Sequence, residues 1–155
     1  MKVVSFLVPF LFGLIGIFSF APFSIKLLLF ISYAYLIYII LYSKEDNFIK
    51  VFLWGIGHWG FGMSWIIVSV YYYGETSIAT SSIIYILLVI ILSLVFTCPL
   101  LLIRVFLNSF KINNNFYKSL VVSSLLMLGE FSRYYLLNGV PLLIPGNIYL
   151  DTITQ

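Results

Sequence analysis

Long apolar runs separated by short polar connectors make up almost the whole chain. The runs cover about residues 3–20, 24–42, 50–73, 78–105 and 119–137, and each approaches or exceeds the roughly 20 residues that a helix needs to cross a bilayer. Lipid offers no partner to an exposed N–H or C=O group, so each run is expected to be helical. The pattern predicts an all-α membrane protein, a bundle of about five transmembrane helices.

No connector is long and polar enough to form a soluble domain, so residues 1–155 are predicted to be a single polytopic membrane domain. The first run is long for a signal peptide, and another apolar run follows at once after Pro22, which fits a helical hairpin better. After the fifth run, Pro141 and Pro145 favour an irregular, apolar tail over residues 138–155.

Composition supports a lipid surrounding. Apolar residues make up 63% of the chain and charged residues 8%, whereas soluble domains carry about 25% charged residues. No basic cluster is interleaved with exposed aromatics, so no nucleic-acid partner is expected. Cys98 is the only cysteine; it is interpreted as a small buried hydrophobe. No metal or other cofactor is expected, and membrane lipids are the predicted partners.

Basic residues indicate the orientation, because cytoplasmic loops carry the excess of Lys and Arg. With the N-terminus in the cytoplasm, only Lys26 and Arg133 lie on the outer side. Six basic residues then lie on the inner side: Lys2, Lys44, Lys50, Arg104, Lys111 and Lys118. We therefore expect the N-terminus inside and the tail after the fifth run outside.

The third run carries small residues at helical spacing. Gly57, Gly60 and Ser64 form one stripe and Gly62 belongs to another, and such residues let neighbouring helices approach closely. His58 is interpreted as a hydrogen-bonded core histidine; a role as proton carrier or ligand is the alternative. A further stripe is aromatic and comprises Trp54, His58, Phe61 and Trp65.

Two opposite charges stand in the fifth run. Glu130 and Arg133 are three positions apart and share one helix face. Charges persist at membrane depth where they face protein or water, or where they pair. With the irregular tail after them, they predict a polar pocket near the outer leaflet. The alternative is a structural ion pair that ties the fifth run to the third.

Four stretches in order resemble the membrane-embedded N-terminal part of bacterial apolipoprotein N-acyltransferases. They are FSFAPFS at 18–24, WGIGHWGFGMSWIIVSVYYYG at 54–74, GEFSR at 129–133 and NGVPLLIPGNIYLD at 138–151. The resemblance implies outer-loop contacts to substrate at Gly139 and Pro141. Val140 and Leu142 stand where the family usually has Phe and Trp.

The resemblance also implies an activity and a location. Proteins of that family carry a nitrilase-like domain in which a Glu, Lys and Cys triad passes an acyl group from a phospholipid to the N-terminal cysteine of an apolipoprotein. No residue of this chain is assigned to that triad, so no catalytic residue is predicted. A separate nitrilase-like chain and a lipoprotein substrate are the implied partners, and the bacterial inner membrane is the implied location, with several spans.

Three functional hypotheses follow. The first is the membrane part of a split or truncated acyltransferase that positions lipid substrates for a partner chain. The second is an inactive remnant, which the scarcity of alanine (only Ala21, Ala34 and Ala79) indirectly favours because it is typical of an AT-rich genome. The third is that the resemblance misleads and the chain is a small membrane scaffold or transport subunit; within that hypothesis, the low charge inside the runs argues against an ion pump.

Overall fold

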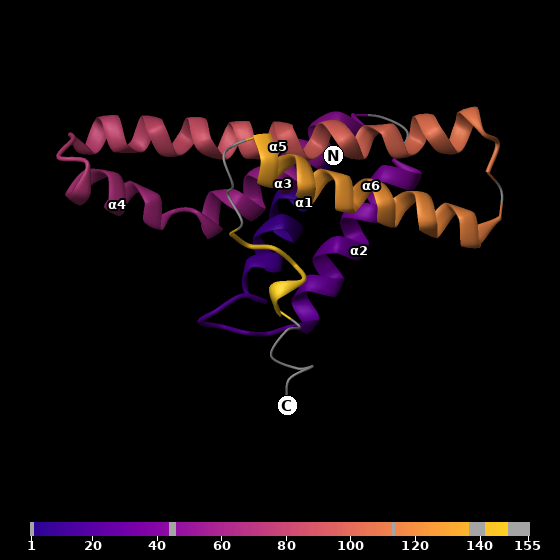
Figure 1. The fold of residues 1–155 in the computed structure, drawn as a ribbon, viewed down its shortest axis with the longest axis horizontal. Helices are drawn as coiled ribbons and strands as arrows, with labels where there is room; N and C mark the ends of the chain where they lie inside the picture. The colour runs from indigo at the N-terminus through magenta and orange to yellow at the C-terminus, as the bar shows by residue number, and fades with distance from the viewer. Residues whose placement is uncertain (1, 44–45, 113, 137–141, 149–155) are drawn as a thin grey trace.

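The computed structural model describes residues 2–43, 46–112, 114–136 and 142–148, and within these ranges the secondary structure is helical, without a strand (Figure 1). The prediction of an all-α protein is confirmed to that extent. The helices are α1 (Lys2–Ile17), α2 (Leu27–Tyr42), α3 (Asn47–Gly62), α4 (Trp65–Tyr73), α5 (Ile78–Ser109) and α6 (Asn115–Leu136).

Helix α5 is the spine of the molecule. It runs unbroken for 32 residues, with α4 beside its N-terminal half and α6 beside its C-terminal half (Figure 1). Helix α3 packs against α5 and, more extensively, against α1, while α2 packs on α1. The first part of the third predicted run, now α3, therefore lies at the centre of the helix packing, whereas α4 has no buried residue.

Helices α1 and α3 cross in direct backbone contact. A β-carbon added to Gly13 would lie 2.0 Å from the carbonyl oxygen of Trp54, and one added to Gly57 would lie 2.1 Å from that of Phe10. No side chain fits at either position, because real β-carbons do not approach heavy atoms so closely. Glycine at both positions is what allows this close crossing.

Aromatic side chains fill the interior beside this crossing. Trp54, Trp59 and Phe96 are fully buried. The ring centroid of Phe96 lies 5.7 Å from that of Trp54 and 5.0 Å from that of Trp59. Many large apolar side chains remain exposed, among them Leu27 at 67% and Val105 at 57%. Such an apolar outer surface suits an apolar surrounding better than water.

The third run is two helices rather than the single helix expected over 50–73. Helices α3 and α4 are bent by 52° at the break between them. Gly60 and Gly62 weaken the helix before the break. The Ser64 hydroxyl then donates to the carbonyl oxygen of Phe61 at 2.9 Å, a local bond that competes with the helical ladder. The expected aromatic stripe is interrupted at the same point.

Among the described residues, length and composition make α5 the one helix long and apolar enough to cross a membrane, and the bent pair α3 and α4 passes the same test when taken together. Helices α1 and α2 are apolar but shorter. The five-span arrangement and its orientation therefore stay predictions.

Cys98 is exposed on α5, which corrects the expectation of a buried thiol. Its neighbours Thr97 and Leu100 are fully buried. Successive residues of a helix point in directions about 100° apart, so the face next to the buried stripe points outward. Because the exterior of the protein is also apolar, a cysteine within an apolar run can lie on either the buried or the exposed face of its helix.

Candidate functional site

Helix α6 brings the GEFSR stretch close to α5. A β-carbon added to Gly129 would lie 3.2 Å from a ring carbon of Phe96 and 3.6 Å from its carbonyl oxygen. Gly129 is buried at this contact. The glycine thus lets α6 approach α5 at the position directly before Glu130.

A proline in α5 explains the next contact. Pro99 has no N–H group, so the carbonyl oxygen of Val95, four residues earlier, lacks its helical donor. The Ser132 hydroxyl of α6 lies 3.4 Å from that oxygen and 2.9 Å from the carbonyl oxygen of Gly129. Its single proton can therefore serve either acceptor, and in one of the two states it satisfies the carbonyl that Pro99 leaves open.

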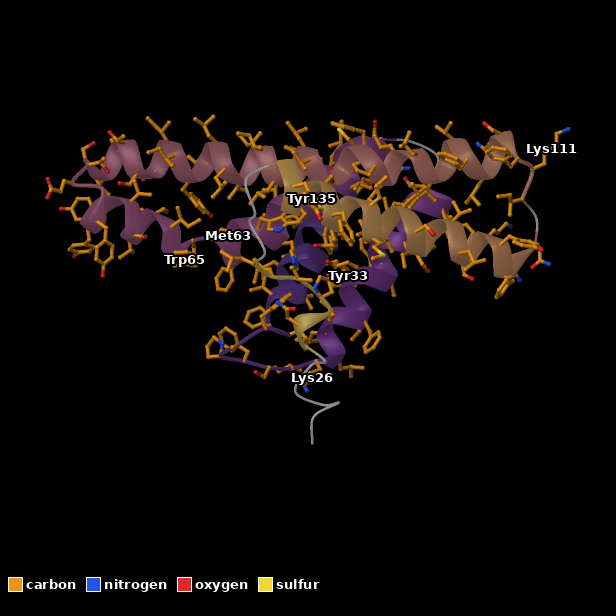
Figure 2. All side chains as sticks on the ribbon, viewed as in Figure 1. Lys26, Tyr33, Met63, Trp65, Lys111 and Tyr135 are labelled. Atoms are coloured by element: carbon orange, nitrogen blue, oxygen red, sulfur yellow. The ribbon has the colours of Figure 1, made fainter. Side chains whose placement is uncertain are left out.

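Glu130 faces α2. The Tyr33 hydroxyl donates to its Oε1 across 3.3 Å, at a part-buried position. The Tyr33 ring meets Trp54 edge-on, with centroids 5.1 Å apart. Through Tyr33, the carboxylate is connected to the buried aromatic centre between α3 and α5 (Tyr33 is labelled in Figure 2).

A pocket of about 550 Å³ lies beside this carboxylate. Apart from Glu130 and the Tyr33 hydroxyl, the walls that the described residues form are apolar, where the sequence predicted a polar pocket. Residues of the 142–148 segment close one side, and Leu143 reaches Gly62 of α3. The pocket is lined by Tyr33, Leu126, Met127, Glu130, Phe131, Ile144, Pro145 and Gly146.

Some of the predicted residues lie outside the described part of the chain. Nothing is described of the Arg133 side chain, of Gly139 or of Pro141. Their roles in ion pairing and in substrate contact stay predictions, as does the alternative of an ion pair to α3.

The residues predicted for helix packing have four different surroundings. Gly57 lies against α1, as described above. Gly60 faces α5, with the Tyr85 hydroxyl as the nearest atom at 3.8 Å from an added β-carbon. Gly62 lies against Ile17 and the 142–148 segment, and Ser64 is exposed at the bend.

Hydrogen-bonded polar groups lie inside the bundle; Ser32 was not predicted from the sequence, whereas His58 was, as a hydrogen-bonded core histidine. The Ser32 hydroxyl donates to the carbonyl oxygen of Phe12 at 2.6 Å and accepts from Nε1 of Trp54 at 3.1 Å. His58 is fully buried, stacks on Trp54, and places Nδ1 3.3 Å from the carbonyl oxygen of Gly13. These contacts fit a core histidine that joins α3 to α1.

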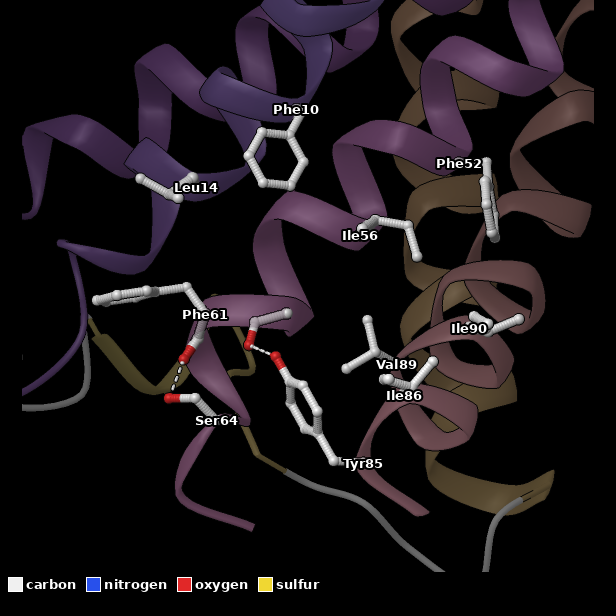
Figure 3. A pocket seen from close by; sticks show the side chains of 11 residues that line it. Phe10, Leu14, Phe52, Ile56, Phe61, Ser64, Tyr85, Ile86, Val89 and Ile90 are labelled. Carbon is white, nitrogen blue, oxygen red and sulfur yellow. Dashed lines mark hydrogen bonds between the residues drawn. The ribbon is translucent and has the colours of Figure 1, made fainter. Parts of the chain in front are cut away.

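A second pocket, of about 690 Å³, lies between α1, α3 and α5 (Figure 3). Its polar groups are already bonded to backbone: Ser64 donates to Phe61, and Tyr85 donates to the carbonyl oxygen of Gly60. Apolar side chains such as Phe10, Ile56 and Val89 form the remaining walls. The described residues of this pocket therefore offer shape and apolar surface, but no group for acid–base or nucleophilic chemistry.

These features define the class, an all-helical protein with an apolar exterior and apolar pockets between its helices. The chain belongs to the family described as the apolipoprotein N-acyltransferase N-terminal domain, which matches residues 12–155.

Relatives of known name support the same assignment. The chain is 28% identical over 152 residues to an apolipoprotein N-acyltransferase of Haemophilus influenzae, 26% over 153 to one of Pasteurella multocida and 29% over 150 to one of Haemophilus ducreyi. The matches cover 96–97% of this chain. The chain spans about 28% of the length of these relatives.

Proposed function

We propose that these residues form the membrane-embedded part of an apolipoprotein N-acyltransferase and position lipid substrates for a nitrilase-like polypeptide that supplies the Glu, Lys and Cys triad. The observation that carries the proposal is the Glu130 pocket in a chain of this family. An apolar pocket with one carboxylate in its wall suits an acyl chain next to a cationic group.

The side chains at the pocket indicate which part of the substrate each would bind. Leu126, Met127 and Phe131 supply apolar wall, so they hold hydrocarbon. Glu130, fixed by the Tyr33 hydroxyl, favours an ammonium over a neutral headgroup. Arg133, Gly139 and Pro141 are proposed to complete the mouth. The chain thereby orients substrate, and the covalent steps take place on the nitrilase-like polypeptide.

We further propose five spans in the bacterial inner membrane, with the N-terminus inside. The distribution of basic residues along the sequence supports this, with six on the predicted inner side and two on the predicted outer side. The test uses a Cys98→Ser background with one new cysteine, either Glu75→Cys or Asn114→Cys. In intact cells, an impermeant maleimide should label position 75 and should not label position 114. The reverse labelling pattern would contradict the proposed orientation.

The activity test combines this chain with the nitrilase-like polypeptide in phospholipid vesicles, and follows N-acylation of a diacylglyceryl-cysteine peptide by mass spectrometry. Transfer should require both components. Glu130→Gln should slow it about tenfold, which corresponds to one lost charge-assisted contact, while the exposed Ser123→Ala variant should match wild type. Equal transfer in the absence of this chain would refute the proposal.

A further inference from the structure

A third pocket, of about 690 Å³, lies at the C-terminal end of α5, far from the Glu130 pocket. It is formed by the end of α2, the end of α5 and the first turn of α6. Unlike the other two pockets, it has a largely polar lining. The lining residues are Leu41, Tyr42, Leu107, Asn108, Lys111, Ile112 and Lys118.

Its charge has one sign. Lys111 and Lys118 supply two ammonium groups, and no carboxylate contributes to the lining that the structure describes. Neither lysine forms a salt bridge with a carboxylate of the described residues. The Asn108 amide and the Tyr42 hydroxyl add neutral hydrogen-bonding groups. Such a set favours an anion with several acceptor oxygens.

The backbone holds Lys111 in a conformation that lysine rarely adopts. Its φ is 48°, and its N–H donates to the carbonyl oxygen of Asn108 at 3.3 Å while that of Ile112 donates to Leu107 at 3.1 Å. These two bonds form a Schellman motif, in which glycine is the usual residue at the left-handed position. A lysine there is explained if its ammonium group is used in the pocket.

Exposed aromatic rings surround this end of the molecule. Phe106 and Phe110 stack with ring centroids 5.8 Å apart, and Phe116 meets Tyr117 edge-on at the same centroid distance of 5.8 Å. All four are exposed, Phe110 at 68% and Phe116 at 65%. Aromatic rings beside basic residues are typical of the depth at which lipid headgroups lie.

We propose that this pocket binds the headgroup of an anionic phospholipid, with the phosphate between Lys111 and Lys118. The apolar lining residues Leu41, Leu107 and Ile112 would cover the glycerol and the first methylenes of the chains, which a free phosphate lacks. Basic pockets between helices on the cytoplasmic side of a membrane bind such lipids. The inference rests on the membrane location proposed above, and is independent of acyl transfer.

The test measures lipid binding by the full chain purified in nonionic detergent. Short-chain phosphatidylglycerol and phosphatidylcholine with the same acyl chains are titrated separately, and bound lipid is counted by native mass spectrometry. Phosphatidylglycerol should bind more tightly, by about fivefold for each lysine, and its advantage should shrink as salt is raised. Lys111→Gln with Lys118→Gln should remove the advantage, and replacement of both by Arg should keep it.

Lys26→Gln is the matched control, since it removes the same charge at the other end of the molecule and should leave the lipid preference intact. If the double variant melts at the same temperature as wild type in phosphatidylcholine, the chain still folds. Equal binding of the two lipids by wild type, or an equal loss in Lys26→Gln, would overturn the proposal. Stabilisation by inorganic phosphate as large as that by phosphatidylglycerol would also overturn it, in favour of a site for free anions.

Discussion

Gly13 on α1 and Gly57 on α3 lie at one crossing, where each faces the backbone of the other helix. A β-carbon would come within 2.0 Å of the Trp54 carbonyl oxygen at the first position and within 2.1 Å of the Phe10 carbonyl oxygen at the second. Because the obstacle is backbone, no change of rotamer can make room. The position of α1, and with it the Gly13 carbonyl that meets His58, depends on these two residues.

Gly57→Ala is expected to destabilise the chain by about 1–3 kcal/mol, as overpacking of a tight contact does. Gly60→Ala is the control on the same helix, because its β-carbon would have no neighbour closer than 3.8 Å. That variant should be neutral or slightly stabilising, since alanine favours helix. Unfolding in mixed detergent, followed by tryptophan fluorescence, measures both; equal effects would mean that the crossing is looser than described.

Tyr33→Phe should weaken the link between α2 and α6, because it removes the hydroxyl that donates to Glu130. In a double-mutant cycle with Glu130→Gln, we expect a coupling free energy of about 0.6 kcal/mol, typical of hydrogen bonds between membrane helices. Tyr38→Phe, at an exposed position of the same helix, should show no coupling to Glu130→Gln. Strictly additive effects of Tyr33→Phe and Glu130→Gln would contradict the contact.

Ser132→Ala should destabilise the folded chain only while Pro99 is present. In the wild-type chain the Ser132 hydroxyl reaches the Val95 carbonyl oxygen that Pro99 leaves without a helical donor. In a Pro99→Ala background the helix supplies that donor itself, so the cost, about 0.5–1.5 kcal/mol, should largely vanish. Ser123→Ala, whose hydroxyl bonds within α6, should cost the same in both backgrounds. An unchanged cost for Ser132→Ala would exclude this compensation.

Ser32→Ala should destabilise the bundle by about 1–3 kcal/mol, because it leaves Nε1 of the buried Trp54 without the acceptor seen here. The Ser82 hydroxyl donates to the Ile78 carbonyl oxygen of its own helix at 2.8 Å, so Ser82→Ala serves as the comparison and should change stability by less than about 0.5 kcal/mol. Thermal unfolding of the two variants measures both effects; an equal loss of stability in Ser32→Ala and Ser82→Ala would contradict the contact between Ser32 and Trp54.

Local pattern predicted the helices well, because apolar runs and prolines act on the nearby backbone. The runs at 24–42 and 78–105 correspond to α2 and α5. The bend after Gly62 was missed, since it depends on a Ser64 side chain bonding its own backbone rather than on periodicity. The contact between Glu130 and Tyr33 could not be predicted either, because the two residues are 97 positions apart and no local sequence signal joins them.

The length of α5 sets a condition on any bilayer that holds it. At 1.5 Å per residue, its 32 residues extend about 48 Å, whereas the hydrocarbon layer is about 30 Å thick. Held along the membrane normal, the helix would extend beyond the hydrocarbon layer; tilt, or locally thickened lipid, would reduce that overhang. If α5 is tilted, its two ends are displaced sideways as well as in depth, so the lipids near α4 and those near the start of α6 would not lie directly opposite one another.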